Sequence, residues 1–153
     1  GKSTTAYLLS KKYGLDILTD SLPILHKGSV LSIGKKGIFV IDGKTIKFDY
    51  TTTSGKLKSI LFLVKSNKNF VREIDVCEII NKIISSLWKA VESVISRRVV
   101  LAYIFLNNKP SLDDIELKTR KIIEKELNRK EIYIVGGNRF SYYKTIYNRI
   151  LKR

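Results

Sequence analysis

The segment that most constrains the fold is an apolar run near the middle of the chain, Ser59-Ile60-Leu61-Phe62-Leu63-Val64. A strand with one wet face alternates apolar and polar side chains. This run is continuously apolar, which is typical of a central strand covered on both faces. Apolar residues then recur at helical spacing from Ile79 to Trp88. A covered strand next to an amphipathic helix predicts an α/β fold, with a mixed sheet and flanking helices.

Three short extended runs precede that strand, at Ser29–Ile33, Ile38–Ile41 and Thr45–Tyr50. The pair Asp42-Gly43 between the last two runs is a strong signal for a hairpin turn, because both residues tolerate positive φ. The run 45–50 alternates apolar and polar residues, which indicates one buried and one wet face. The three runs together predict an early β-meander, and the polar stretch Thr51–Gly55 predicts a loop after it.

Helix boundaries are also readable. The first helix is expected over Thr4–Tyr13 with Gly14 as its C-terminal glycine. Asp75 and Glu78 have the spacing of a capping box at the start of the long amphipathic helix. Later elements are expected as follows: a helix that Arg97-Arg98 closes, a strand or helix at Val99–Leu106, a helix from N-cap Ser111 to about Arg129, a strand at Glu131–Val135, a turn at Gly136-Gly137, and a final helix over Phe140–Leu151.

Composition limits the class of protein. The 153 residues fit one domain, with 44% hydrophobic and 28% charged residues. No apolar stretch reaches the ~18 residues of a membrane span, so a cytoplasmic protein is expected. Cys77 is the single cysteine and stands in an apolar run, which favours a core residue in a reducing compartment over a nucleophile.

The net charge of +15 comes from 29 basic and 14 acidic residues. A surface of this charge attracts polyanions such as nucleotides, nucleic acid or an acidic protein. The lysines are spread along the chain rather than clustered, which favours a solvated lysine-rich exterior over a surface that binds polyanions.

The first residues, Gly1-Lys2-Ser3-Thr4, match the end of a phosphate-binding loop, which reads Gly-Lys-Ser/Thr where a helix begins. In such a loop the glycine lets the backbone approach the phosphates, the lysine reaches the β- and γ-phosphates, and the hydroxyl holds Mg²⁺. The upstream half of the loop would precede Gly1. The chain is therefore expected to lack the first strand and the start of the loop.

A second candidate residue follows the first helix. The run Leu15–Leu18 has strand character and is followed by Asp20. A carboxylate at the end of a strand beside the phosphate loop can accept the proton of an attacking hydroxyl, or hold Mg²⁺ through water. The simpler alternative is that Asp20 and Ser21 cap a turn before Pro23.

These residues resemble the HPr kinase/phosphorylase group, which shares its fold with phosphoenolpyruvate carboxykinase. The specific likeness lies in Gly1-Lys2-Ser3-Thr4-Thr5-Ala6, then Gly14, then Ile17-Leu18-Thr19-Asp20-Ser21-Leu22. In element order it extends further: Leu57–Val64 resembles the strand behind the loop, Phe70–Ile74 resembles the lead into the long helix, and Glu131–Val135 with the closing helix suits the end of such a domain. The resemblance implies a single kinase-like domain over residues 1–153.

The resemblance also implies roles for individual residues. Gly1, Lys2, Ser3 and Thr4 would bind ATP, Ser3 and Asp20 would hold Mg²⁺, and Asp20 and Lys2 would be catalytic. The implied reaction is ATP-dependent phosphorylation of a hydroxyl group, on a protein serine or a small molecule. The second acidic residue of the family falls on Ser21, so this chain departs from the pattern there. The family's protein-substrate motifs have no counterpart here, so the substrate is open, as is an oligomeric state.

Two other functions stay open. One is a non-catalytic module that binds nucleic acid, because the C-terminal segment interleaves aromatic and basic residues; packing of the last helix explains the same pattern. Those residues are Arg139, Tyr142, Tyr143, Lys144, Tyr147, Arg149, Lys152 and Arg153. The other is a degenerate domain that binds nucleotide without turnover. The only histidine, His26, has no acidic or cysteine neighbour in sequence, which disfavours a metal site there.

Overall fold

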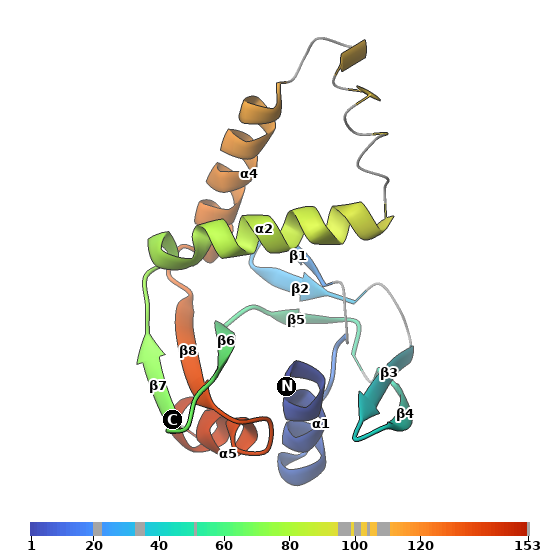
Figure 1. The fold of residues 1–153 in the computed structure, drawn as a ribbon, viewed down its shortest axis with the longest axis vertical. Coiled ribbons are helices and arrows are strands. Elements are labelled where there is room, and N and C mark those ends of the chain that lie inside the picture. The colour runs from blue at the N-terminus through green and yellow to red at the C-terminus, as the bar shows by residue number, and fades with distance from the viewer. Residues whose placement is uncertain are drawn as a thin grey trace. The chain divides into compact units, whose positions relative to one another are not determined.

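The computed structural model describes residues 1–19, 23–32, 36–50, 52–94 and 111–152, together with the single positions 99, 102, 103, 105 and 106. The chain forms two compact units: Gly1–Ile74 with Lys130–Arg153, and Asp75–Arg129. The fold is mixed α/β with small, separate sheets (Figure 1). The first unit contains α1 (Lys2–Tyr13), β1 (Ile24–His26), β2 (Ser29–Leu31), β3 (Lys36–Ile41), β4 (Lys44–Asp49), β5 (Ser54–Lys56), β6 (Ser59–Lys65), β7 (Phe70–Glu73), β8 (Glu131–Gly137), α5 (Tyr142–Ile146) and the π-helical turn η1 (Tyr147–Leu151).

The main sheet of the first unit is mixed and has the strand order β6-β8-β7. β6 pairs parallel with β8, from Ser59 opposite Glu131 to Lys65 opposite Gly137, and β7 pairs antiparallel with β8. The apolar strand β6 is therefore an edge strand and half-buried, and its expected central position is wrong. An apolar run indicates that both faces of a strand are covered. Whether the strand is central or at an edge of the sheet depends on which strands pair with it. The central position belongs to β8.

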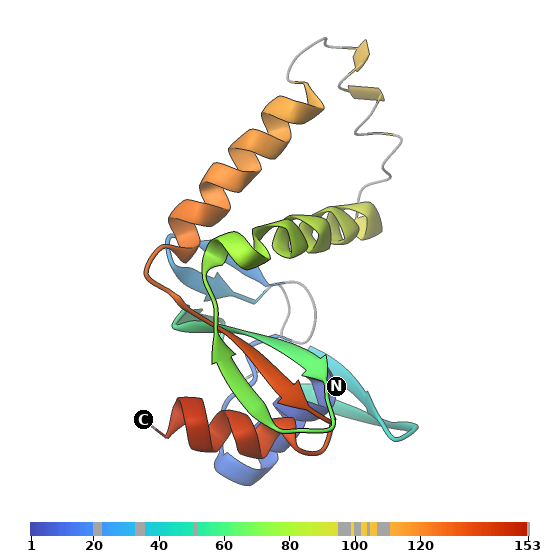
Figure 2. The same ribbon diagram turned by 60° about the vertical axis from the view of Figure 1, so that its left-hand side comes forward.

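The core of the first unit lies between β8 and the C-terminal helix. Figure 2 shows α5 packed against one face of the sheet. The side chain of Val135 is 0% exposed and that of Ile146 is 1% exposed, and both belong to one apolar cluster. The other buried members are Tyr133, Tyr142 and Ile150, with Leu9, Leu61, Leu63 and Val71 packed around them. The expected final helix is thus present, although its last turn is the wider π form.

The first helix contacts both α5 and β3 (Figure 1). The ring of Tyr13 stacks on that of Tyr147, with centroids 3.6 Å apart and planes 1° from parallel. As expected, α1 ends at Tyr13, and Gly14 takes φ 69° and donates its N–H to the Ser10 carbonyl. The strand expected at Leu15–Leu18 is absent, since residues 14–19 pair with no strand. Strand propensity alone does not form a strand without a hydrogen-bonded neighbour.

The early strands form two small sheets instead of one meander. Among the described strands, β2 pairs with β1 and β5, and β3 pairs with β4 alone. The predicted hairpin is confirmed, with positive φ at Asp42 (51°) and Gly43 (76°), the geometry of a type I′ turn. The segment expected to be a polar loop supplies β5, because the backbone of Ser54–Lys56 pairs with the free edge of β2. Pairing here is decided by an available edge and not by side-chain polarity.

The second unit consists in its described part of α2 (Val76–Val94) and α4 (Leu112–Leu127), with helical backbone also at the five positions described within 99–106. Arg97-Arg98, expected to close α2, lies outside the described residues. The two helices pack on each other, and Arg120 donates a 2.7 Å hydrogen bond to Asn81. Within the residues described, no helix is both long and apolar enough to cross a membrane.

Both predicted helix starts of the second unit are confirmed. Ser111 accepts the Asp114 N–H through its hydroxyl (3.1 Å), and the Asp114 carboxylate accepts the Ser111 N–H (3.1 Å). At α2, Glu78 accepts the Asp75 N–H (3.3 Å), while Asp75 accepts the N–H of Cys77 (2.8 Å). Side chains therefore satisfy amide groups that the first turn leaves without a partner.

Neighbouring isoleucines of α4 allow a matched stability test. Ile123 is 6% exposed and Ile122 is 62% exposed. We expect Ile123→Ala to lower the free energy of unfolding by about 2–5 kcal/mol, because it leaves a cavity. Ile122→Ala should change it by less than about 0.5 kcal/mol, since only an exposed group is removed. Urea unfolding followed by circular dichroism measures both, and equal losses would contradict the packing of α4.

Candidate functional site

The first turn of α1 divides its side chains between the interior and the surface. Thr4 and Thr5 are buried, and the Thr5 hydroxyl and N–H both bond to the Gly1 carbonyl, at 2.8 and 2.9 Å. Lys2 is exposed and Ser3 is half-buried. Gly1 occupies the N-cap, where it has no side chain to cover the amide groups of the turn. The turn thus presents a lysine, a hydroxyl and the positive end of the helix dipole.

Close packing with Tyr142 fixes where this turn lies. A Cβ added at Gly1 would lie 3.1 Å from Cε2 of Tyr142, and one added at Gly137 would lie 3.5 Å from Cδ1 of the same ring. The ring therefore lies against both glycines. Gly137 ends β8, whose parallel partner β6 ends opposite it at Lys65. The N-terminus of α1 consequently lies beside the carboxyl end of the parallel strand pair, where open α/β sheets bind ligands.

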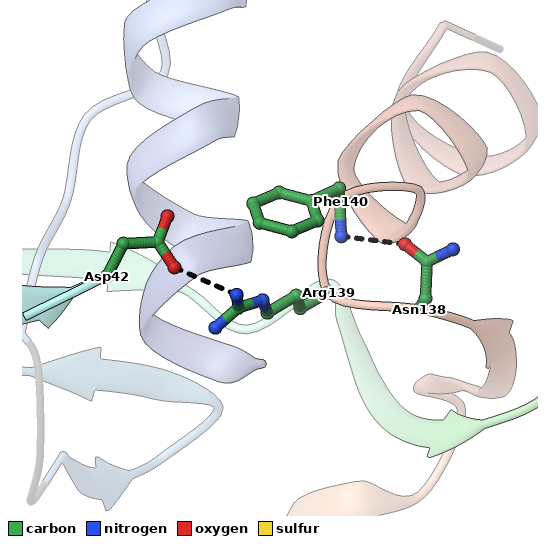
Figure 3. Close-up of polar contacts among 4 residues, drawn as sticks. All are labelled: Asp42, Asn138, Arg139 and Phe140. Carbon is green, nitrogen blue, oxygen red and sulfur yellow. Dashed lines mark hydrogen bonds and ion pairs between the residues drawn. The ribbon is translucent and has the colours of Figure 1, made fainter.

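The turn between β8 and α5 is held by a set of hydrogen bonds, one of which Figure 3 shows. The Asn138 side-chain oxygen accepts the Phe140 N–H (2.9 Å). The Ser141 hydroxyl accepts the Asn138 N–H (2.9 Å) and lies 2.7 Å from the side-chain oxygen of Asn69, in the β6–β7 part of the chain. These bonds fix the backbone on both sides of Arg139.

Arg139 extends from this turn to the β3–β4 hairpin. Its Nη2 lies 2.9 Å from Oδ1 of Asp42, and its guanidinium carbon lies 4.6 Å from the ring centroid of Phe140 (Figure 3). The side chains of Arg139 and Asp42 are 56% and 49% exposed. The Cβ of Arg139 is 3.7 Å from the position that a Cβ on Gly1 would take. Arg139 therefore begins next to the N-terminus of α1, where it adds a second cation to Lys2.

The structure brings part of the expected site together. Gly1, Lys2, Ser3 and Thr4 share one helical turn, although Thr4 is turned inward. Asp20 lies outside the described residues, so its place relative to this turn stays a prediction.

Arg139 and its ion pair with Asp42 are not indicated at this place by the sequence patterns. The available signal was a Gly-Gly-Asn sequence directly after the apolar strand Glu131–Val135, because glycines at a strand end permit close approach of other backbone. Two of the C-terminal tyrosines pack against the first helix, as expected if their spacing serves the packing of the last helix. The ring centroid of Tyr143 lies 6.2 Å from that of Tyr13, and the ring of Tyr147 stacks on the same ring.

Cys77 belongs to the second unit, and its expected core position is wrong because the residue is exposed. It occupies the first turn of α2, and that helix buries the face of Ile79 and Ile80 instead. A hydrogen bond to the Asp75 carboxylate, together with its negative charge, raises the pKa of the Cys77 thiol. A raised pKa leaves less of the reactive thiolate at neutral pH.

Comparisons with known proteins add no assignment, since searches of protein-family models, curated proteins and solved structures found no match to the chain. Among the described residues no group of three His, Cys, Asp or Glu side chains is placed to hold a metal ion.

Substitution of Gly137 tests the close packing at this site. Gly137 has φ 151°, and an added Cβ would lie 2.6 Å from the Ser141 hydroxyl and 2.7 Å from the Asn69 side-chain oxygen. We expect Gly137→Ala to cost about 1–3 kcal/mol of stability through backbone strain, before any added clash. Gly55→Ala is the control, because nothing lies within 4 Å of its added Cβ. Thermal unfolding of both variants checks this, and equal melting temperatures would refute it.

The reactivity of Cys77 should depend on Asp75. Asparagine caps a helix as well as aspartate does, so Asp75→Asn removes the charge and keeps the cap. The pKa of the thiol should then fall, and alkylation by iodoacetamide at pH 8 should be faster than in the unmodified protein. The two rates should converge at high pH, where both thiols are ionised. Identical rates at every pH would contradict the coupling.

Proposed function

We propose that this protein is an ATP-dependent phosphotransferase that phosphorylates a hydroxyl group of a protein serine or a small molecule. The observation that carries the proposal is the place of Gly1-Lys2-Ser3, at an uncapped helix N-terminus beside the carboxyl end of the parallel strands β6 and β8. The resemblance of the residues from Gly1 to Leu22 to HPr kinase-like domains supports the same reaction class.

The residues at this turn fit the phosphates of a nucleotide. Amide groups of a first helical turn have no carbonyl partner within the helix and bind anions well. Gly1 brings no side chain that would cover them, and the turn carries Lys2 but no acidic residue. The half-buried hydroxyl of Ser3 is a ligand of the type that Mg²⁺ prefers.

Each residue has a definite task in the proposed reaction. Lys2 and the amide groups of the turn would hold Mg-ATP, which would supply the phosphoryl group, and its metal would neutralise part of the charge that develops there. Asp20 accepts the proton of the substrate hydroxyl, whose oxygen forms the new bond to phosphorus as the bond to ADP breaks. Lys2 stabilises negative charge on the transferred group, and Ser3 holds the metal.

Replacement of Asp20 separates chemistry from binding. We expect Asp20→Asn in the full-length protein to lower turnover by about 10²–10⁴-fold, the usual contribution of a general base, while Mg-ATP binding is retained. Asp16→Asn is the matched control, because it removes the same charge from the segment after the same helix. Phosphoryl transfer is measured from γ-labelled ATP to a mixture of candidate hydroxyl compounds and proteins, and binding by calorimetry.

Lys2→Ala is the complementary variant and should weaken Mg-ATP binding. Full turnover in Asp20→Asn would remove Asp20 from the mechanism. Affinity for single-stranded nucleic acid that falls steeply with salt, together with no response to Mg-ATP, would favour a basic binding module instead.

A further inference from the structure

We propose that Arg139 is a second phosphate-binding residue of the nucleotide site, and that Asp42 is the counter-ion that holds it in the protein without nucleotide. This inference rests on the proposed function. It concerns a residue after the last strand of the first unit, far in sequence from the loop motif at Gly1–Thr4.

The backbone geometry places Arg139 beside the phosphate turn. Its Cβ lies 3.7 Å from the position of a Cβ on Gly1, and its neighbours Asn138 and Phe140 are tied together by a 2.9 Å hydrogen bond. The guanidinium therefore starts from a fixed point next to the N-terminus of α1. Phosphate held there would meet an arginine, whose planar group can bind two phosphate oxygens at once.

The present partner of Arg139 is one that a phosphate can replace. The ion pair with Asp42 is about half exposed on both sides, and exposed ion pairs contribute little to stability. A single Nη2–Oδ1 contact of 2.9 Å also uses little of a guanidinium, which carries five N–H donors. Contact with the Phe140 ring, 4.6 Å from the guanidinium carbon, holds the side chain near this place.

The hairpin geometry gives Asp42 a fixed position. Asp42 and Gly43 form the turn between β3 and β4 with φ 51° and 76°. An incoming phosphate must compete with this carboxylate for Arg139 and is also repelled by its charge. Asp42 therefore opposes nucleotide binding, whereas Arg139 favours it.

The two variants that break this ion pair should act in opposite directions. We expect Arg139→Ala to weaken Mg-ATP binding by about tenfold or more, which is the value of a lost charged hydrogen bond. Asp42→Asn should tighten binding, and the double variant should bind like Arg139→Ala. A purely structural ion pair predicts the same direction for both single variants. Arg149→Ala, an exposed cation of the C-terminal segment, controls for net charge.

The measurement is isothermal titration of the full-length protein with Mg-ATP at fixed salt, with Lys2→Ala alongside and circular dichroism as a check of folding. Opposite shifts for Asp42→Asn and Arg139→Ala support the inference. Unchanged Mg-ATP affinity in Arg139→Ala, or weaker binding in both Arg139→Ala and Asp42→Asn, would overturn the inference. Weaker binding in Lys2→Ala would in that case still support a nucleotide site at the Gly1 turn. No Mg-ATP binding by the unmodified protein would overturn the proposed function as well.

Discussion

Pairing of β8 along both of its edges is the interaction on which the rest of the first unit depends. In the described sheet β6 and β7 each pair with β8 and not with each other, so removing β8 leaves two strands without a sheet. Its inward side chains, led by the fully buried Val135, also form the surface on which Ile146 and the rest of α5 pack. Because Gly136 has no side chain, the ring of Phe70 can lie directly over it. One strand thus supplies hydrogen bonds, core and helix docking together.

The same strand positions the candidate site. β8 ends at Gly137, and the ring of Tyr142 lies against both that glycine and Gly1. A side chain at either glycine would meet the ring, so close packing joins the carboxyl end of the sheet to the N-terminus of α1. The cations Lys2 and Arg139 reach this place from opposite ends of the sequence. The proposed anion site therefore depends on tertiary packing and not only on the loop motif.

Charge is arranged differently at the two helix starts of the second unit and at α1. The starts of α2 and α4 are closed by the carboxylates of Asp75 and Asp114, which accept backbone N–H groups. At α1 the corresponding place has Gly1 and no carboxylate in the first turn. A helix start that is left uncapped keeps its amide groups and dipole available to an external anion. This contrast supports placing the proposed phosphate contacts at α1 rather than at α2 or α4.

The sequence by itself determined the local elements: α1 and its end at Gly14, the Asp42-Gly43 hairpin, and the caps at Asp75 and Ser111. These depend on turn residues and hydrogen bonds between neighbours, which short-range patterns encode. Only the tertiary structure decided that β6 is an edge strand, that Ser54–Lys56 pairs with β2, and that Cys77 faces solvent. Strand partners and burial depend on residues distant in sequence. For the same reason the motif at Gly1 was readable from the sequence, whereas the position of Arg139 beside Gly1 and its ion pair with Asp42 were not.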